Sequence, residues 1–226
     1  MIPSLALLPS QVGIWLTVAV LVAAAAAMSA AVVPAVAGFA NTETEWYARR
    51  THVWLAALFA VPLLRFSDDA AATAGFLVMA VVAAHLATID LGEERLPDPL
   101  TVAGGAAVVA AFTVSAALPG GRGWSSLTDA LIGSFTMLLF FFAVYIAKPH
   151  SFGFGDVKLG VLLGFVTGWV GGWPLAWWAT LAGLVLQGAG SIILISIGRV
   201  DRRTELPLGP ALLFGAWGAM LLSSTL

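Results

Sequence analysis

The sequence predicts an all-α fold, a polytopic membrane bundle of about eight transmembrane helices, from its composition, its hydropathy and the clustering of its charges. Hydrophobic residues make up 60% of the 226 residues, charged residues only 10%, and the mean hydropathy is +0.98. Soluble domains carry roughly 25% charged residues, so ten basic and twelve acidic side chains are too few to cover a soluble surface of this size. The charges lie between long uncharged stretches, which indicates that most of the chain is in contact with lipid.

These uncharged stretches, taken in order, define the expected helices. The second is the weakest, because it has only 14 residues and contains Pro62; if it is interfacial, seven helices cross. The stretch Leu159–Gly198 has 40 residues and breaks at Gly171-Gly172-Trp173-Pro174 into two crossings. The expected crossings are Val12–Ala40, Val53–Phe66, Ala70–Ile89, Leu100–Leu118, Leu127–Ala147, two within Leu159–Gly198, and Leu208–Leu222.

The basic residues predict the orientation of the bundle. Eight of the ten fall in one set of alternate loops, which places that set in the cytoplasm and both termini outside. The alternation of basic and less basic loops also supports the weak second crossing. Without it, the basic loops would no longer all lie on the same side of the membrane. Four tryptophans fall near the predicted outer ends, either as interfacial aromatics or as packing residues: Trp124, Trp169, Trp173 and Trp177. The eight cytoplasmic residues are Arg49, Arg50, Arg95, Lys148, Lys158, Arg199, Arg202 and Arg203; the other two are Arg65 and Arg122.

Some classes of chemistry are excluded by composition. The chain has no cysteine, which excludes disulfides, thiolate metal sites and a thiol nucleophile. The net charge of −2 provides no electrostatic footprint for nucleic acid. We expect no cofactor and no metal ion, and the sequence does not predict the oligomeric state.

Two acidic residues are distinguished by their position. Asp90 lies at the end of one crossing, and Asp156 lies at the start of another, directly after Gly153-Phe154-Gly155. Two crossings separate them, so the topology places both at the same depth on the cytoplasmic side. If two such carboxylates approach each other, they cannot both ionise cheaply; one keeps its proton, and the pair supplies an acid and a base for peptide hydrolysis. The glycines would let a substrate backbone come close. The alternative is that both are ordinary helix-end residues, with Asp156 favoured by the helix dipole.

Three strings of sequence bear on this choice, and each lies at the edge of a cytoplasmic loop. Asp90 is followed by Leu96-Pro97-Asp98 and then Leu100-Thr101; the second string is Gly153-Phe154-Gly155-Asp156-Val157-Lys158-Leu159, and the third is Leu206-Pro207-Leu208-Gly209-Pro210. In this order and topology they resemble the type IV prepilin peptidase family, membrane aspartyl proteases of the GxGD class. The resemblance covers roughly Val53 to the C-terminus. It divides the chain into a transmembrane helix with a short cytoplasmic linker (1–52) and a prepilin-peptidase-like membrane protease domain (53–226).

The resemblance implies a function and a set of site residues. The function is removal of the cytoplasmic leader of a prepilin or pseudopilin, after a glycine, at the inner membrane, in type IV pilus assembly or secretion. Asp90 and Asp156 match the catalytic aspartates. Lys158 matches the motif lysine, which would bind substrate charge or lipid phosphate, or simply snorkel to the interface. The remaining motif or substrate-binding positions are Gly153, Gly155, Pro97, Pro207, Gly209 and Pro210.

The sequence departs from the family pattern near its N-terminus. Bifunctional members carry two Cys-x-x-Cys pairs there and resemble an N-methyltransferase. This chain has no cysteine and only the linker Asn41–His52 at that position, so it resembles a short form that lacks this region. A zinc site of that type is excluded because its ligands are absent.

The remaining polar residues have ordinary interpretations. His85 lies within a crossing, where we expect a packed or hydrogen-bonded side chain, and we expect His52 and His150 to be interfacial. The acidic residues Glu93, Glu94 and Asp98 form either a solvated loop or an attractor for a basic leader.

Other functions are compatible with the same residues. One is a different GxGD protease, of the preflagellin or presenilin-like type. Another is a small transporter that uses Asp90 and Asp156 as a proton or cation site. A third is a catalytically idle scaffold in a pilus or secretion assembly.

Overall fold

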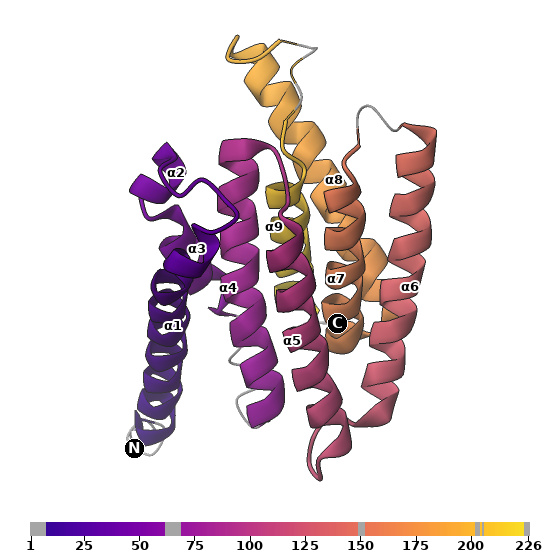
Figure 1. Ribbon diagram of the computed structural model, residues 1–226. Coiled ribbons are helices and arrows are strands. Elements are labelled where there is room, and N and C mark those ends of the chain that lie inside the picture. The colour runs from indigo at the N-terminus through magenta and orange to yellow at the C-terminus, as the bar shows by residue number, and fades with distance from the viewer. Residues whose placement is uncertain (1–7, 62–68, 149–151, 202–203, 205, 224–226) are drawn as a thin grey trace, which may run out of the picture.

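The computed structural model describes residues 8–61, 69–148, 152–201, 204 and 206–223, and every regular element within these ranges is a helix (Figure 1). The all-α prediction is therefore confirmed. The helices are α1 (Leu8–Val36), α2 (Glu45–Ala48), α3 (Thr51–Phe59), α4 (Ala70–Glu93), α5 (Asp98–Ala117), α6 (Gly123–Ala147), α7 (Phe154–Gly171), α8 (Trp173–Ser196) and α9 (Gly209–Leu222).

Six of the described helices are long and apolar enough to cross a membrane: α1, α4, α5, α6, α7 and α8. The predicted second crossing begins in α3, and residues 62–66 of it lie outside the described residues. The predicted last crossing corresponds to α9, which has 14 residues. A helix of this length spans about 21 Å, less than the roughly 30 Å of a hydrocarbon core. That crossing is therefore shorter than a full span, and α9 instead packs against α4, α7 and α8 within the bundle.

Helices α4 and α7 form the centre of the bundle. In α4, 78% of the apolar window is buried, and in α7 67%, against 33% or less in the other four long helices. Helix α4 packs against α1, α3, α5 and α9, and α7 packs against α5, α6, α8 and α9. We use "upper end" for the end of the bundle at which α4 ends and α5, α7 and α9 begin, drawn at the top of Figure 1. The two helices that carry Asp90 and Asp156 are thus the most enclosed of the six.

The ends of α4 and the start of α5 are fixed by capping. Asp69 is the N-cap of α4: one carboxylate oxygen accepts a hydrogen bond from the Ala72 N–H at 3.0 Å, and the other accepts one from the Ser115 hydroxyl. Glu94, the C-cap of α4, has a left-handed conformation (φ 52°) that terminates the hydrogen-bonding pattern after Glu93. Pro97 then caps α5. This sharp reversal holds the α4–α5 loop against the upper end.

Small residues allow α6 and α7 to pack with their backbones in contact. Gly160, Gly164 and Gly168 recur every four residues along one face of α7. Gly164 faces the backbone of Gly133 on α6, and the ring of Phe141 covers Gly160. Without a hydrophobic driving force between helices in lipid, such close packing is a main source of their association.

The predicted tryptophan belt is only partly present. Trp169 is 1% exposed and stacks on Phe112, with ring centroids 4.7 Å apart, so it is a packing residue. Trp124 and Trp173 are exposed near the lower end, as interfacial aromatics are, and Trp177 on α8 is also exposed. The sequence could not separate these cases, because both kinds lie near helix ends.

A buried polar cluster attaches the N-terminal helices to α4. The Nε2 atom of His85 lies 3.0 Å from the Ser29 carbonyl oxygen, and its Nδ1 atom lies 2.9 Å from the Tyr47 hydroxyl. A carbonyl only accepts, so Nε2 carries the proton and Nδ1 accepts from Tyr47. Burial raises the pKa of the Tyr47 phenol, which keeps it a donor. The expectation of a hydrogen-bonded His85 is confirmed.

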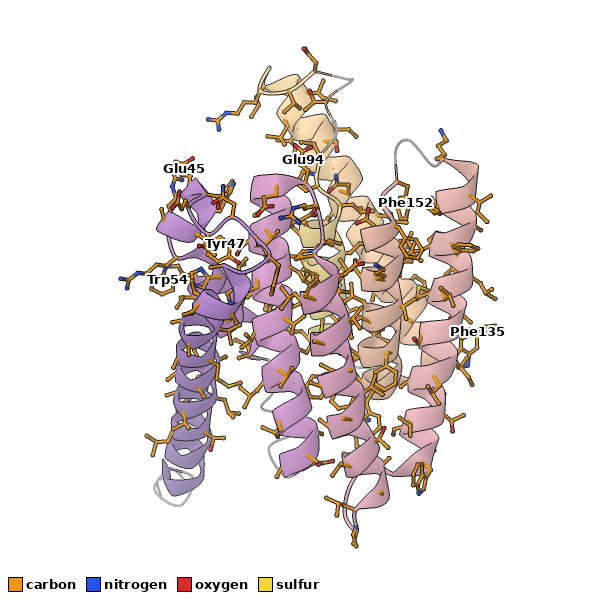
Figure 2. The ribbon with its side chains drawn as sticks, viewed as in Figure 1. Glu45, Tyr47, Trp54, Glu94, Phe135 and Phe152 are labelled. Atoms are coloured by element: carbon orange, nitrogen blue, oxygen red, sulfur yellow. The ribbon has the colours of Figure 1, made fainter. Side chains whose placement is uncertain are left out.

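The expectation for the other two histidines has different outcomes. His52 is 5% exposed and stacks on His85 with ring centroids 5.1 Å apart, so the prediction that it is interfacial is wrong. Its burial follows from the docking of α3 on α4 and α1, which the sequence does not reveal. Trp54, two residues along α3, points away from the bundle instead (Figure 2). His150 lies outside the described residues.

We predict that Gly164→Val destabilises the bundle by about 1–3 kcal/mol, the usual effect of overpacking. A Cβ atom at this position would lie 2.6 Å from the Gly133 carbonyl oxygen, a backbone atom that no side-chain rotation can move. The measurement is thermal unfolding of the detergent-solubilised protein. Gly218→Val on α9 is the matched control, because a Cβ atom there has nothing within 4 Å. Equal melting temperatures for the two variants would contradict the prediction.

We also predict that His85→Leu lowers the free energy of unfolding by about 1–3 kcal/mol, because it removes both hydrogen bonds of the buried ring and leaves the buried Tyr47 hydroxyl without this partner. Tyr47→Phe removes only one of the two hydrogen bonds and should have the smaller effect. Unfolding curves for both variants test this order, and a Tyr47→Phe effect as large as that of His85→Leu would be evidence against the cluster.

Candidate active site

Asp90 lies three residues before the end of α4 and is 5% exposed. Its Oδ2 atom accepts a hydrogen bond from the Gly209 backbone N–H at 2.9 Å. Gly209 is the first residue of α9, and the first N–H groups of a helix have no partner inside the helix. The buried carboxylate therefore satisfies an otherwise unpaired donor, at the positive end of the α9 dipole.

The contact with Asp90 explains why position 209 is a glycine. A Cβ atom there would lie 2.6 Å from Asp90 Oδ2, which is too close for any other residue without displacement. Pro210 follows at the second position of α9, where a missing N–H removes no helical hydrogen bond. Pro207 is half-buried in the segment that leads into α9. The Pro207–Pro210 motif thus delivers one backbone donor to Asp90.

Asp156 is the third residue of α7 and is partly buried. Its N–H donates to the Gly153 carbonyl at 3.1 Å, and its carboxylate interacts with the Gly153 backbone. Gly155 packs on Leu96 of the α4–α5 loop, since a Cβ atom there would lie 2.9 Å from Leu96 Cβ. Leu96 therefore occupies the space that the missing side chain of Gly155 leaves. Gly153, in contrast, is exposed to solvent.

Both aspartates lie at the upper end of the bundle, where the negative charge of Asp156 acts on the carboxyl group of Asp90. No ion pair found among the described residues involves either carboxylate. Within the same residues, no three His, Asp or Glu side chains gather as a metal-binding group. Glu94 adds further negative charge near Asp90, and Figure 2 shows it at the top of α4. Two carboxylates without a cation partner are a suitable arrangement for acid–base chemistry.

Lys158 stands beside this pair but is already engaged. Its Nζ atom lies 2.5 Å from Asp98 Oδ1 and 4.9 Å from the centre of the Phe154 ring. The ion pair joins α7 to the first residue of α5. Pro97, directly before, is buried, and its carbonyl accepts a hydrogen bond from the Thr101 hydroxyl at 3.1 Å. Lys158 and Pro97 therefore shape the loop around the aspartates.

The acidic loop is mostly paired rather than free. Glu93 accepts a hydrogen bond from the Asn41 N–H at 2.7 Å and pairs with Arg95 at 2.5 Å. Arg95 also donates to the Phe39 carbonyl at 3.0 Å. Glu93 and Asp98 thus hold neighbouring segments together, whereas Glu94 is exposed and has no ion pair among the described residues. The sequence did not indicate that Phe39–Asn41 is attached to the end of α4. The Phe39 carbonyl and the Asn41 N–H that make these contacts are backbone groups, which no side-chain pattern reveals.

Comparison with known families is consistent with this geometry. Residues 77–188 match the model of the type IV leader peptidase family. This segment is about half of the chain; it runs from α4 into α8 and includes both Asp90 and Asp156, while Gly209 lies beyond it. Searches of the curated proteins and of the solved structures find no match. Because the matched segment holds both halves of the carboxylate pair on the two central helices, the chain belongs to the type IV leader peptidase family, a family of peptidases.

Proposed function

We propose that this chain is a membrane aspartyl endopeptidase that removes the cytoplasmic leader peptide of prepilin or pseudopilin substrates. The observation that carries the proposal is that Asp90 and Asp156 lie at the same end of the two most buried helices, where their charges interact, within the segment matched by a peptidase family. Neither carboxylate has a cation partner among the described residues. The pair can therefore hold one proton between its two members.

The reaction needs one ionised and one protonated carboxylate. The ionised member takes a proton from a water molecule, whose oxygen attacks the scissile carbonyl carbon. The protonated member donates its proton to the carbonyl oxygen, which gives a neutral tetrahedral intermediate. Collapse of the intermediate breaks the C–N bond, and the leaving nitrogen receives the proton first taken from water. The carboxylate that protonated the carbonyl oxygen takes a hydroxyl proton back as the new carboxyl group forms. Each turnover therefore consumes one water and returns both carboxylates to their starting protonation states.

The Gly209 N–H assigns different roles to the two oxygens of Asp90. Oδ2 is held by this hydrogen bond, and in the proposed mechanism Oδ1 is the oxygen that exchanges a proton with water or substrate. Holding the carboxylate in one orientation lowers the entropic cost of aligning it with the water and the substrate. Asp156 is held through the turn of Gly153, whose exposed backbone provides room for an extended peptide.

The upper end is the cytoplasmic end in this proposal. Eight of the ten basic residues fall in the predicted cytoplasmic loops, which connect the helices at the end where Asp90 and Asp156 lie. Asp90 is three residues from the end of α4, a depth of about 4.5 Å. A prepilin has its leader in the cytoplasm and its apolar helix in the bilayer. Its scissile bond, after a glycine, would then lie at the depth of the aspartates.

We predict that Asp90→Asn and Asp156→Asn each reduce cleavage of a co-expressed prepilin by at least about 10²–10⁴-fold, the usual contribution of general acid–base catalysis. Asparagine can still accept the Gly209 hydrogen bond but cannot exchange a proton. Conversion of precursor to mature pilin on immunoblots measures the effect, and N-terminal sequencing identifies the bond that is cut. Asp201→Asn, in an exposed segment, is the control. If both variants reach the membrane at normal levels and still process the precursor, this mechanism is incorrect.

We further predict that Gly209→Ala lowers kcat by about 10–100-fold, because a methyl group there displaces Asp90 Oδ2 from its position. Gly218→Ala on the same helix has open space around the new methyl group and should leave the rate unchanged. The comparison uses initial rates on purified protein at equal folded concentration. A Gly209→Ala enzyme as fast as the Gly218→Ala enzyme would show that the hydrogen bond does not matter for the reaction.

A further inference from the structure

A groove of about 330 Å³ lies between α8 and α9, near the end of α4 that carries Asp90. Leu91 lines it, and Leu91 follows Asp90 on α4; Pro210 also lines it, and Pro210 follows Gly209. One end of the groove is therefore lined by the residues that directly follow Asp90 and Gly209 in the chain. Phe214, on α9, marks its inner part, five residues and about 7.5 Å from Gly209.

The groove exists because α8 and α9 separate near the upper end. Lower in the bundle the two helices touch through Gly183 and Gly215, whose backbones are in contact. Above this point α8 continues past the ends of its neighbours (Figure 1), and a Cβ atom at Gly190 would have nothing within 4 Å. Gly190 faces the groove, together with Leu186 and Leu194, one turn on either side.

The chemistry of the groove favours an apolar occupant. Gln187 and Ser191 are its polar side chains, and both are already engaged: Gln187 donates to the Leu206 carbonyl at 3.1 Å, and Ser191 donates to the Gln187 carbonyl at 2.8 Å. The remaining walls are leucine, proline, alanine, phenylalanine and glycine. A ligand with polar groups would lose hydrogen bonds to water here without replacing them.

A second groove, of about 290 Å³ between α5, α6 and α7, is less suitable. It approaches Asp156 through Val157, but Lys158 lines the same end and is paired with Asp98 across α7 and α5. A chain that ran from this groove to the aspartates would have to pass or break that ion pair. Among the described residues, no charged side chain lines the α8–α9 groove.

We propose that the α8–α9 groove binds the first one to two turns of the substrate's apolar helix, on the C-terminal side of the scissile bond. This inference rests on the proposed function, which supplies a substrate with an apolar helix directly after the cleaved bond. The groove begins beside Asp90 and extends toward the middle of the bundle, the direction that such a helix must take into the bilayer.

The first test fills each groove by the same substitution. Gly190→Leu occupies the α8–α9 groove, Gly105→Leu occupies the other, and Gly188→Leu adds the same side chain to α8 away from either groove. Leucine has a higher helix propensity than glycine, which favours a folded α8 in both α8 variants. We expect kcat/KM for a full-length prepilin to fall about 10-fold or more with Gly190→Leu and to stay within about twofold with the other two.

Each outcome of this test has a defined meaning. A Gly190→Leu enzyme within twofold of the wild type, an equal loss with Gly188→Leu, or a loss confined to Gly105→Leu would each overturn the groove assignment while leaving the proposed peptidase activity intact. A wild-type enzyme that cleaves no prepilin would instead overturn the proposed function, and the groove assignment with it.

The second test uses the absence of cysteine from the chain, which makes any introduced cysteine unique. In Asp156→Asn protein, Leu194→Cys places a thiol in the groove and Gly188→Cys places one outside it. The substrate is a prepilin with one cysteine in the first two turns after the scissile bond. We expect a disulfide-linked adduct with Leu194→Cys under mild oxidation and none with Gly188→Cys. Equal adduct formation at both positions, or none at Leu194→Cys, would contradict docking in this groove.

Discussion

The hydrogen bond between the Gly209 N–H and the Asp90 carboxylate is the contact on which the upper end of the bundle depends. It joins the first residue of α9 to the last turn of α4, across 119 residues of sequence. A buried carboxylate and an unpaired helix N–H would each be costly in lipid, and each satisfies the other. This one bond sets the depth at which α9 begins, fixes one oxygen of Asp90 and requires a glycine at position 209.

The fold and the positions of the two candidate aspartates could be predicted from the sequence because lipid surrounds most of the chain. Uncharged stretches of sufficient length have few alternatives to a transmembrane helix, so the long crossings were located correctly. Charged residues are expensive in such helices, which left few candidates for chemistry. The motif around Asp156 and the Leu-Pro string after Asp90 then favoured these two over ordinary helix-end residues, and the structure places both at the same end of the two central helices.

The contacts that complete the site were not predictable, because topology gives the depth of a residue but not its lateral neighbours. The donor to Asp90 is a backbone N–H, which no side-chain pattern reveals. Gly155 leaves room for the side chain of Leu96 rather than for a substrate backbone. Lys158 forms an ion pair with Asp98. His52 was expected at the interface, but the docking of α3 buries it. In each case the partner comes from a different helix or loop.

The short length of α9 connects the candidate active site with the groove. A helix that crossed the whole bilayer would carry its first N–H groups to the upper surface, above Asp90. Because α9 begins at the depth of Asp90, its first donor reaches the carboxylate, and the preceding segment, Leu206–Leu208, continues without helical structure. Non-helical backbone at this depth is tolerated where it is buried or lines a cavity, and Leu206 and Pro207 line the groove beside α8. The same late start of α9 therefore supplies a donor to the candidate catalytic carboxylate and leaves space next to it for an apolar segment.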